Sequence, residues 1–316
     1  MLSLVSKKTK YVISIVLGML LIASFLIPAE GYAAAAKYQF GFIDVGNSAE
    51  DGTKVGNRYF WYDSDHDTGK RILYTAKSYT GSKTKLDSTS ETELIEAAIG
   101  EEVLYNGSKV YYTKMQVNME TGENKTEIYS VSPSGRNKKK IKTLTYDTPY
   151  TFAKIYKIYN NKLYYVATTM DEETGLFSKG MLYSLDLETK KTKKLSSNFL
   201  CYDQQNTSRY IYGGTDDYNV VIYDCKEGKT IKKMESAMNL AVGTDYIVYA
   251  KGEDEVTLYK ASASGSNAKK LKTFDNDNEK YIDHSRHEAY FYSFGENVFR
   301  YDFDTNKIEG IIFADR

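Results

Sequence analysis

Alternating carboxylates occupy the stretch from Asp63 to Gly69, which reads Asp-Ser-Asp-His-Asp-Thr-Gly. Carboxylate oxygens at every second position are the hard ligands that begin a calcium-binding loop. The glycine comes one position late, however, and the twelfth position is Tyr74, where an EF-hand has glutamate. The sequence therefore excludes an EF-hand. We interpret Asp63, Asp65 and Asp67 as a solvated turn, with a simpler surface calcium site as the alternative, and we expect no other cofactor.

The remaining candidates for metal binding or catalysis are isolated. His284 and His287 lie close together, but a zinc site needs three or four ligands and the chain has 3 histidines in all. The acidic run Asp275–Glu279 is interpreted as a connecting loop, with calcium binding as the alternative. We find no G-x-S-x-G nucleophile elbow, phosphate-binding loop or dinucleotide fingerprint. We therefore assign no catalytic residue.

Two longer stretches, residues 114–126 and 168–180, mix acidic, methionine and aromatic residues. Each is predicted to be a long hairpin connection, and the two belong to neighbouring repeats of the pattern described below. Loops carried on a rigid scaffold are where binding residues usually lie. We therefore predict a binding site here, with two solvated hairpin tips as the alternative. The predicted ligand-binding residues are Met115, Met119, Glu120, Met170, Glu172, Glu173 and Phe177.

The elements that would position these residues recur six times. In each repeat an aromatic-rich strand is followed by a strand with an aliphatic–aromatic pair. The aromatic strands are marked by Tyr62, Tyr112, Tyr165, Tyr212, Tyr249 and Tyr292. The pairs are Leu73-Tyr74, Ile128-Tyr129, Leu182-Tyr183, Ile222-Tyr223, Leu258-Tyr259 and Val298-Phe299. With an apolar strand before and a lysine-rich strand after, each repeat has four strands in about 40–50 residues, which is typical of propeller blades.

We therefore predict that residues 37–316 form an all-β domain, a six-bladed β-propeller of four-stranded antiparallel blades, with a β-sandwich as the alternative. The 30 tyrosines agree with this, because tyrosine favours half-buried pleated surfaces. The first strand of the first blade is predicted at Tyr38–Asp44. Residues 88–98 are predicted to hold a short helical turn.

Lysine-rich strands are predicted at the outer edges of the blades. Lysine on an exposed edge opposes pairing with another chain. We interpret these lysines as edge protection, with a basic rim for an anionic polymer as the alternative. Because 42 basic and 42 acidic residues give no net charge, we expect no nucleic-acid partner. The edge lysines include Lys139, Lys140, Lys142, Lys191, Lys193, Lys194, Lys232, Lys233, Lys269, Lys270 and Lys272.

Residues 1–36 have the features of a signal peptide. A lysine-rich start, Lys7–Lys10, precedes the uncharged apolar run Tyr11–Ile27, and Ala33–Ala36 supply small residues for cleavage. An uncleaved membrane anchor is the alternative. We expect a protein that is secreted or held at the cell surface, outside the cytoplasmic membrane, with a membrane contact only if this segment is retained.

The two cysteines, Cys201 and Cys225, are too few for a disulfide-stapled fold. We interpret them as small buried apolar residues. A single disulfide is the alternative, because exported proteins meet an oxidising environment.

Two strand-and-turn segments, Ile128–Asn137 and Leu258–Asn267, resemble those of the YWTD propellers in low-density-lipoprotein-receptor-type proteins. Phe60–Asp63 reads Phe-Trp-Tyr-Asp and is similar to the YWTD tetrad itself. The nearest group is the secreted bacterial propellers similar to those receptor domains. The resemblance implies six blades, an extracellular location, and binding or scaffolding more often than catalysis. Other repeats lack the terminal aspartate of the tetrad, so contacts between blades that depend on it are not implied.

We therefore expect an exported, non-catalytic propeller that binds a protein, peptide or cell-wall glycan through its loop face. The alternative is a propeller hydrolase or lactonase with acidic residues at its central channel. Three or more carboxylate, amide or imidazole side chains converging there would favour the enzyme. A channel lined by tyrosine, aliphatic and small residues would favour binding.

Overall fold

The computed structural model describes residues 38–311 except 65–69, 90–94, 175–176, 202–208, 216–218, 243–244, 253–254, 276–279, 285–287, 294–297 and 303–306, and only the backbone from residue 274 on. Every regular element in this part of the chain is a β-strand, which confirms the all-β prediction. No helix long and apolar enough to cross a membrane occurs among these residues. The predicted signal peptide lies outside them.

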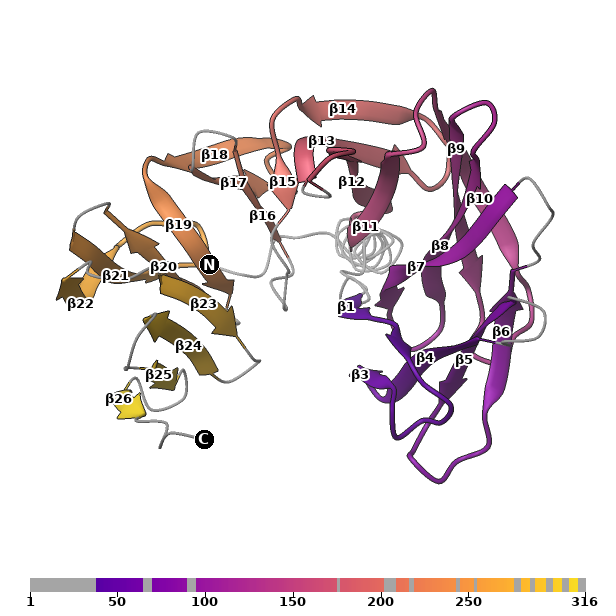
Figure 1. The fold of residues 1–316 in the computed structure, drawn as a ribbon, viewed down its shortest axis with the longest axis horizontal. Helices are drawn as coiled ribbons and strands as arrows, with labels where there is room; N and C mark the ends of the chain where they lie inside the picture. The colour runs from indigo at the N-terminus through magenta and orange to yellow at the C-terminus, as the bar shows by residue number, and fades with distance from the viewer. Residues whose placement is uncertain are drawn as a thin grey trace, which may run out of the picture. The chain divides into compact units, whose positions relative to one another are not determined.

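The described strands group into six sheets (Figure 1). The first sheet has the order β2-β4-β5-β6, with β3 also on β4: β2 (Asp44–Val45), β3 (Thr53–Val55), β4 (Arg58–Ser64), β5 (Arg71–Ala76) and β6 (Thr84–Ser88). The second has the order β1-β7-β8-β9-β10: β1 (Gln39–Phe42), β7 (Ile95–Tyr105), β8 (Val110–Asn118), β9 (Glu123–Val131) and β10 (Lys139–Tyr146).

In each of the other four sheets, strand order follows chain order. The third contains β11 (Thr151–Tyr159), β12 (Lys162–Met170), β13 (Phe177–Asp186) and β14 (Thr192–Ser196). The fourth contains β15 (Leu200–Cys201), β16 (Tyr210–Gly214), β17 (Val220–Asp224) and β18 (Lys229–Met234). The fifth contains β19 (Ala237–Val242), β20 (Tyr246–Lys251), β21 (Glu255–Ser262) and β22 (Lys269–Asp275). The sixth contains β23 (Lys280–His284), β24 (Glu288–Ser293), β25 (Val298–Asp302) and β26 (Lys307–Ile311).

The prediction that Tyr38–Asp44 is the first strand of the first sheet is wrong. Its central residues form β1, which pairs antiparallel with β7 of the second sheet, and only the short β2 pairs with β4 of the first. In this position the ring of Phe40 stacks on that of Tyr156 in the third sheet, with the ring centroids 5.5 Å apart. A repeat pattern identifies strands, but a strand's partner is decided by such long-range packing.

The helical turn predicted within residues 88–98 is also wrong where that segment is described. The strand β6 ends at Ser88, and β7 already includes Ala97 and Ala98, which pair with Gln116 and Met115 of β8. The alanine and glutamate content of the segment favours helix. Pairing with β8 overrides that weak local preference.

Aromatic rings stack directly across neighbouring strands in four of the sheets. The pairs are Trp61 with Tyr74, Tyr112 with Tyr129, Tyr165 with Tyr183 and Tyr249 with Tyr259, with ring centroids 5.7, 5.7, 5.2 and 5.4 Å apart. Three of the predicted markers, Tyr62, Tyr212 and Tyr292, are one residue out of register with the aromatic residue of the next strand, since they pair with Leu73, Ile222 and Val298. A shift of one residue places a side chain on the opposite face of its sheet.

A β-bulge recurs opposite the aliphatic–aromatic pair in the first five sheets. In the first, Leu73 pairs with Asp87 and Tyr74 with Lys85, which leaves Leu86 as the extra residue. The equivalent extra residues in the outer strands are Ile141, Leu195, Ile231 and Leu271. Leu86 is buried, so the bulge turns an apolar side chain toward the core. Bulges and lysines both hinder pairing at a sheet edge, and edge protection stays our interpretation of these lysines.

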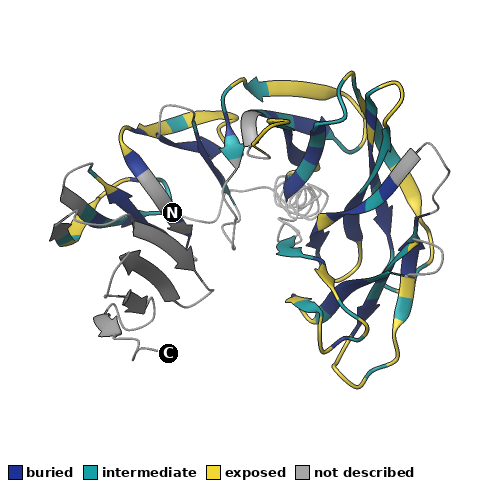
Figure 2. Cartoon of the chain, viewed as in Figure 1, coloured by how far each residue is buried: buried dark blue, intermediate teal, exposed yellow. Residues whose placement is uncertain are grey.

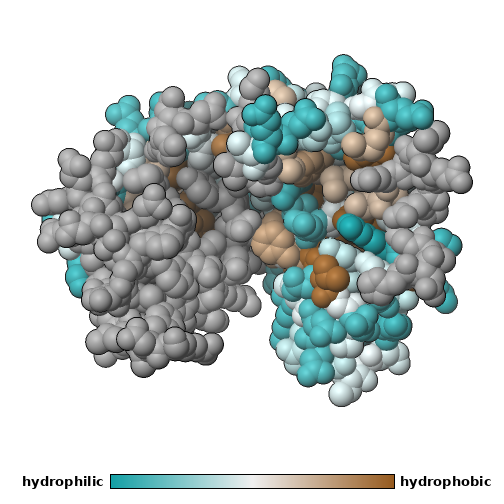
Figure 3. Space-filling model, in the orientation of Figure 1, coloured by the Kyte–Doolittle hydropathy of each residue, from teal (hydrophilic) through white to brown (hydrophobic). Residues whose placement is uncertain are grey.

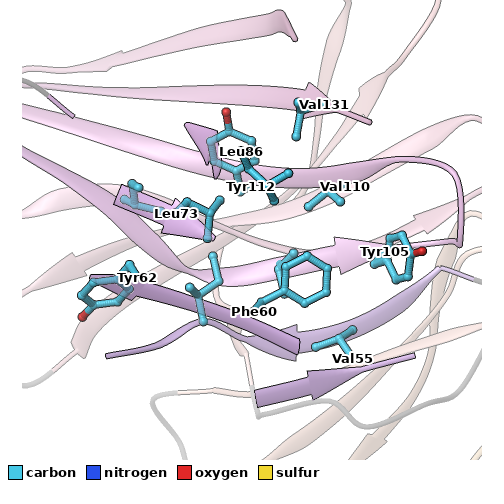
Figure 4. Close-up of a cluster of buried hydrophobic side chains, with 12 residues drawn as sticks. Val55, Phe60, Tyr62, Leu73, Leu86, Tyr105, Val110, Tyr112 and Val131 are labelled. Atoms are coloured by element: carbon cyan, nitrogen blue, oxygen red, sulfur yellow. The ribbon is translucent and has the colours of Figure 1, made fainter. Parts of the chain in front are cut away.

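The core lies between sheets that follow one another in the chain. Between the first and second sheets, Phe60 and Leu73 pack with Val110 and Tyr112 (Figure 4). Corresponding clusters join the second sheet to the third, the third to the fourth and the fourth to the fifth. Figure 2 shows the outer strands β14 and β18 largely exposed and the strands beside them largely buried.

Cys225 is buried and carries a free thiol, while the side chain of Cys201 is outside the described residues. Burial raises the pKa of the Cys225 thiol to about 12. Because the thiolate is the reactive form, we expect iodoacetamide to leave Cys225 unmodified in the native protein at pH about 8 and to modify it in urea. Peptide mass mapping checks this. Native labelling of Cys225 at the rate seen in urea would contradict the buried site.

Candidate functional site at two neighbouring hairpins

The two stretches predicted as long loops are mostly strand. The strand β8 continues to Asn118 and β9 begins at Glu123, so the connection is only residues 119–122. In the third sheet, β12 continues to Met170 and β13 begins at Phe177. Polar composition suggested loops here, but the ladders persist through these polar residues to short turns. The binding residues therefore belong to two hairpins.

The tip of each hairpin is held by one side chain that accepts backbone hydrogen bonds. The side-chain oxygen of Asn118 accepts bonds from the N–H groups of Glu120 and Thr121 at 3.0 and 3.1 Å. Asp171 accepts bonds from the N–H groups of Glu173 and Thr174 at 3.2 and 2.9 Å. The bonds from Thr174 hold the pKa of Asp171 below its usual range. Residues 118–121 and 171–174 are thus each held in a turn by hydrogen bonds within the protein.

The connection between β10 and β11 touches both hairpins. The Asn124 side-chain N–H donates to the Pro149 carbonyl at 3.2 Å, and the Met170 N–H donates to the Tyr150 carbonyl at 3.0 Å. The Tyr150 hydroxyl also bonds Glu172, which raises the pKa of Tyr150. We call the surface formed by residues 118–124, 147–150 and 169–174 the hairpin wall.

The hairpin wall exposes acidic and apolar side chains together. Met119 is 59% exposed, and Glu120, Glu172 and Glu173 are exposed. Figure 3 shows one face of the protein, on which hydrophilic residues and several hydrophobic patches lie side by side. The other predicted binding residues are less accessible or undescribed: Met115 and Met170 are half-buried on their strands, and the side chain of Phe177 is outside the described residues.

The predicted calcium ligands are only partly described. Asp63 is half-buried near the end of β4 and pairs with Ile72, while Asp65 and Asp67 are outside the described residues. Within the described part of the chain, no three His, Cys, Asp or Glu residues lie close enough together to hold a metal ion. The calcium site stays a prediction.

A buried charged cluster between the first and second sheets was not predicted. Asp87 of β6 accepts hydrogen bonds from the Tyr112 hydroxyl and the Lys138 ammonium, both at 2.7 Å, and Lys114 lies 3.6 Å away. Burial alone would raise the pKa of Asp87, but the bonds from Lys138 and Tyr112 and the charge of Lys114 hold it below its usual range. The cluster links two sheets, and its only sequence signal is an aspartate at the bulge of a lysine-bearing strand.

A second unpredicted group joins the second and third sheets. The Lys154 ammonium on β11 lies 3.1 Å from a carboxylate oxygen of Glu102 on β7 and 3.8 Å from one of Glu101. The Glu102 side chain is 3% exposed and that of Glu101 is 66% exposed. Burial raises the pKa of Glu102 to about 7, although Lys154 opposes the shift. Adjacent residues of a strand point to opposite faces, but nothing in the sequence indicated that Glu102 is the buried one or that Lys154 is its partner.

No family model matches the chain, and no curated protein matches it. Among solved structures it is similar to the β-propeller domain of the Trilobed protease from Pyrococcus furiosus, with 14% identity over 86% of this chain and 84% of that one and a TM-score of 0.48. It is also similar to the WD40 domain of SCAP from fission yeast, with 9% identity over 85% of this chain and 73% of that one and a TM-score of 0.47. A third similar structure is an oligogalacturonate lyase in complex with manganese, with 10% identity over 88% of this chain and 79% of that one and a TM-score of 0.46.

Proposed function

We propose that this chain is an exported six-bladed β-propeller that binds a protein or peptide at the hairpin wall and catalyses no reaction. The six sheets in chain order, with apolar clusters between consecutive sheets from the first to the fifth, support the blade arrangement. The lysine-rich start, apolar run and alanines of residues 1–36 support export.

One observation carries the binding function. Two hairpins from neighbouring sheets, bridged by Pro149 and Tyr150, present an exposed methionine beside exposed carboxylates on a hydrogen-bonded support. A flexible, polarisable methionine adapts to different apolar partners and is frequent at binding surfaces. An ordered support lowers the entropy lost on binding. Together these features suit recognition of a peptide or protein segment.

The buried carboxylates favour a scaffold over the hydrolase alternative. Asp87, Glu102 and Asp224 each have a lysine or arginine partner within the protein, and each is closed to solvent. A catalytic carboxylate must reach the substrate. These three carboxylates instead pair with basic side chains of the protein itself.

The proposed function is tested by binding of the mature protein to peptide and glycan arrays, with and without calcium. We expect a peptide ligand whose affinity falls about tenfold in Met119→Ala, because buried apolar contacts are the usual centre of an interface. Val45→Ala is the matched control, since Val45 is 63% exposed and lies outside the hairpin wall. Equal losses in both variants, or a glycan ligand unaffected by Met119→Ala, would reject the hairpin wall as the site.

A further inference from the structure

We propose that the ligand of the hairpin wall is a cationic, extended peptide segment in which an apolar residue lies next to lysine or arginine. This inference rests on the proposed function and specifies its ligand. The argument comes from the local charge balance, from an unsatisfied acceptor, and from the exposed methionine.

The hairpin wall contains six acidic residues and no basic residue, although the chain as a whole has no net charge. Its acidic residues are Glu120, Glu123, Asp147, Asp171, Glu172 and Glu173. Among the described ion pairs only Glu123 has a partner here, Lys125 at 2.6 Å. The buried carboxylates elsewhere are paired, and the whole chain has no net charge. The local excess of negative charge at the wall would attract a cationic partner.

A buried acceptor lies in the same surface. Asn124 is 1% exposed, and its side-chain N–H is bonded to Pro149, but no donor among the described residues reaches its side-chain oxygen. A buried oxygen without a donor is costly, about 1–3 kcal/mol. A ligand rich in N–H donors, such as a peptide backbone with lysine or arginine side chains, carries the type of group that this oxygen lacks. It would reach the oxygen only if the side chains that cover Asn124 move.

The apolar component of the ligand follows from Met119. Its side chain is 59% exposed at the tip of the β8–β9 hairpin, directly before Glu120. A partner with an apolar residue beside a basic one would cover both side chains at once. A neutral glycan fits less well, because sugars stack on open aromatic faces and the one aromatic of the wall, Tyr150, is half-buried with its hydroxyl bonded to Glu172.

The test compares two synthetic peptides of equal length, one alternating leucine with lysine and arginine and the other with glutamate at the basic positions. Binding to the mature protein is measured by fluorescence anisotropy at ionic strengths of about 0.02 and 0.5 M. We expect binding of the cationic peptide only, with an affinity that falls at least about tenfold at the higher salt. The triple variant E120K/E172K/E173K should lose at least about tenfold in affinity at low salt.

Glu188→Lys is the matched control, because Glu188 is an exposed glutamate in the β13–β14 turn, outside the hairpin wall. It should bind the cationic peptide as the wild type does, and thermal unfolding should show that all variants are folded. Equal binding of the cationic peptide by the triple variant and the wild type, or no binding at all, overturns the inference. If a neutral or acidic array peptide still binds and depends on Met119, the cationic ligand is wrong and the proposed function stands. If no array ligand depends on Met119, both fail.

Discussion

Asp87→Ala is expected to lower the free energy of unfolding by about 3 kcal/mol, measured by urea denaturation at pH about 7. The Asp87 side chain is 5% exposed, and the substitution would leave the buried Tyr112 hydroxyl without its acceptor. Lys114, whose side chain is 14% exposed, would lose its carboxylate and keep the Ser88 carbonyl at 3.0 Å and the Tyr129 ring at 5.7 Å. Removing one member of a buried ion pair leaves the other charge buried without a partner. That cost is the main part of the loss in free energy of unfolding.

Two comparison variants separate the buried pair from ordinary surface charge. Glu123→Ala removes a pair with Lys125 in which both side chains are more than a third exposed, so its effect should stay under about 1 kcal/mol. Asp87→Asn keeps an acceptor for Tyr112 and removes only the charge. Its loss in free energy of unfolding should therefore lie between those of Asp87→Ala and Glu123→Ala. An Asp87→Ala protein as stable as Glu123→Ala would show that the cluster does not hold the first two sheets together.

Asp87 should also make the folded protein less stable in acid. Its pKa is lowered in the folded protein, so its contribution is present above pH about 4 and is lost as the pH falls through the folded value. In Asp87→Ala that part of the acid sensitivity should disappear. Unfolding curves of wild type and variant should therefore converge below the lowered pKa and separate as the pH rises.

The repeated elements could be predicted from the sequence because their signal is local. The aliphatic–tyrosine pairs mark strands in every repeat, and the lysines mark the outer strands beside them. The bulges escaped prediction because Leu86 and Ile141 look like ordinary apolar residues of a strand. Only their register against the partner strand shows that each is an extra residue. The partner of β1 was missed for the same reason.

The sequence predicted several residues of the candidate site, but not the contacts that hold them together. Residues such as Met119 and Glu172 could be selected because methionine and acidic residues cluster in neighbouring repeats. The hydrogen bond from Tyr150 to Glu172 could not be predicted, since Tyr150 lies more than twenty residues before Glu172 and belongs to no recognisable motif. Asp87 was missed likewise, because its partners Tyr112 and Lys138 are 25 and 51 residues away in the chain. Contacts of that range are set by packing between sheets.

Glu102→Gln is expected to remove a decline in stability that the wild type shows between pH about 4.5 and about 7. The pKa of Glu102 is raised from 4.5 to about 7 in the folded protein, mainly by burial. Below pH 4.5 the carboxyl is protonated in both states, and as the pH rises through 7 the folded protein must hold a buried charge. The stabilisation present at low pH is therefore lost as the pH rises. A shift of this size corresponds to about 3 kcal/mol.

Glu101→Gln is the matched control for this titration. Its carboxylate lies near the same lysine, 3.8 Å from Lys154, but its side chain is 66% exposed and water stabilises its charge. Its removal should leave the pH dependence in place, because water screens the interaction between an exposed carboxylate and Lys154. In Glu102→Gln, Glu101 remains beside Lys154, so the ammonium keeps an acidic neighbour.

The free energy of unfolding of both variants is measured in urea at intervals between pH 4 and 8. A flat profile in Glu102→Gln with a wild-type profile in Glu101→Gln would assign the titration to the buried carboxyl. The reverse result would mean that the exposed glutamate dominates the interaction with Lys154. A wild-type profile that does not decline over this range would mean that Lys154 compensates the buried charge fully. Glu102 would then be a permanent ionic link between the second and third sheets.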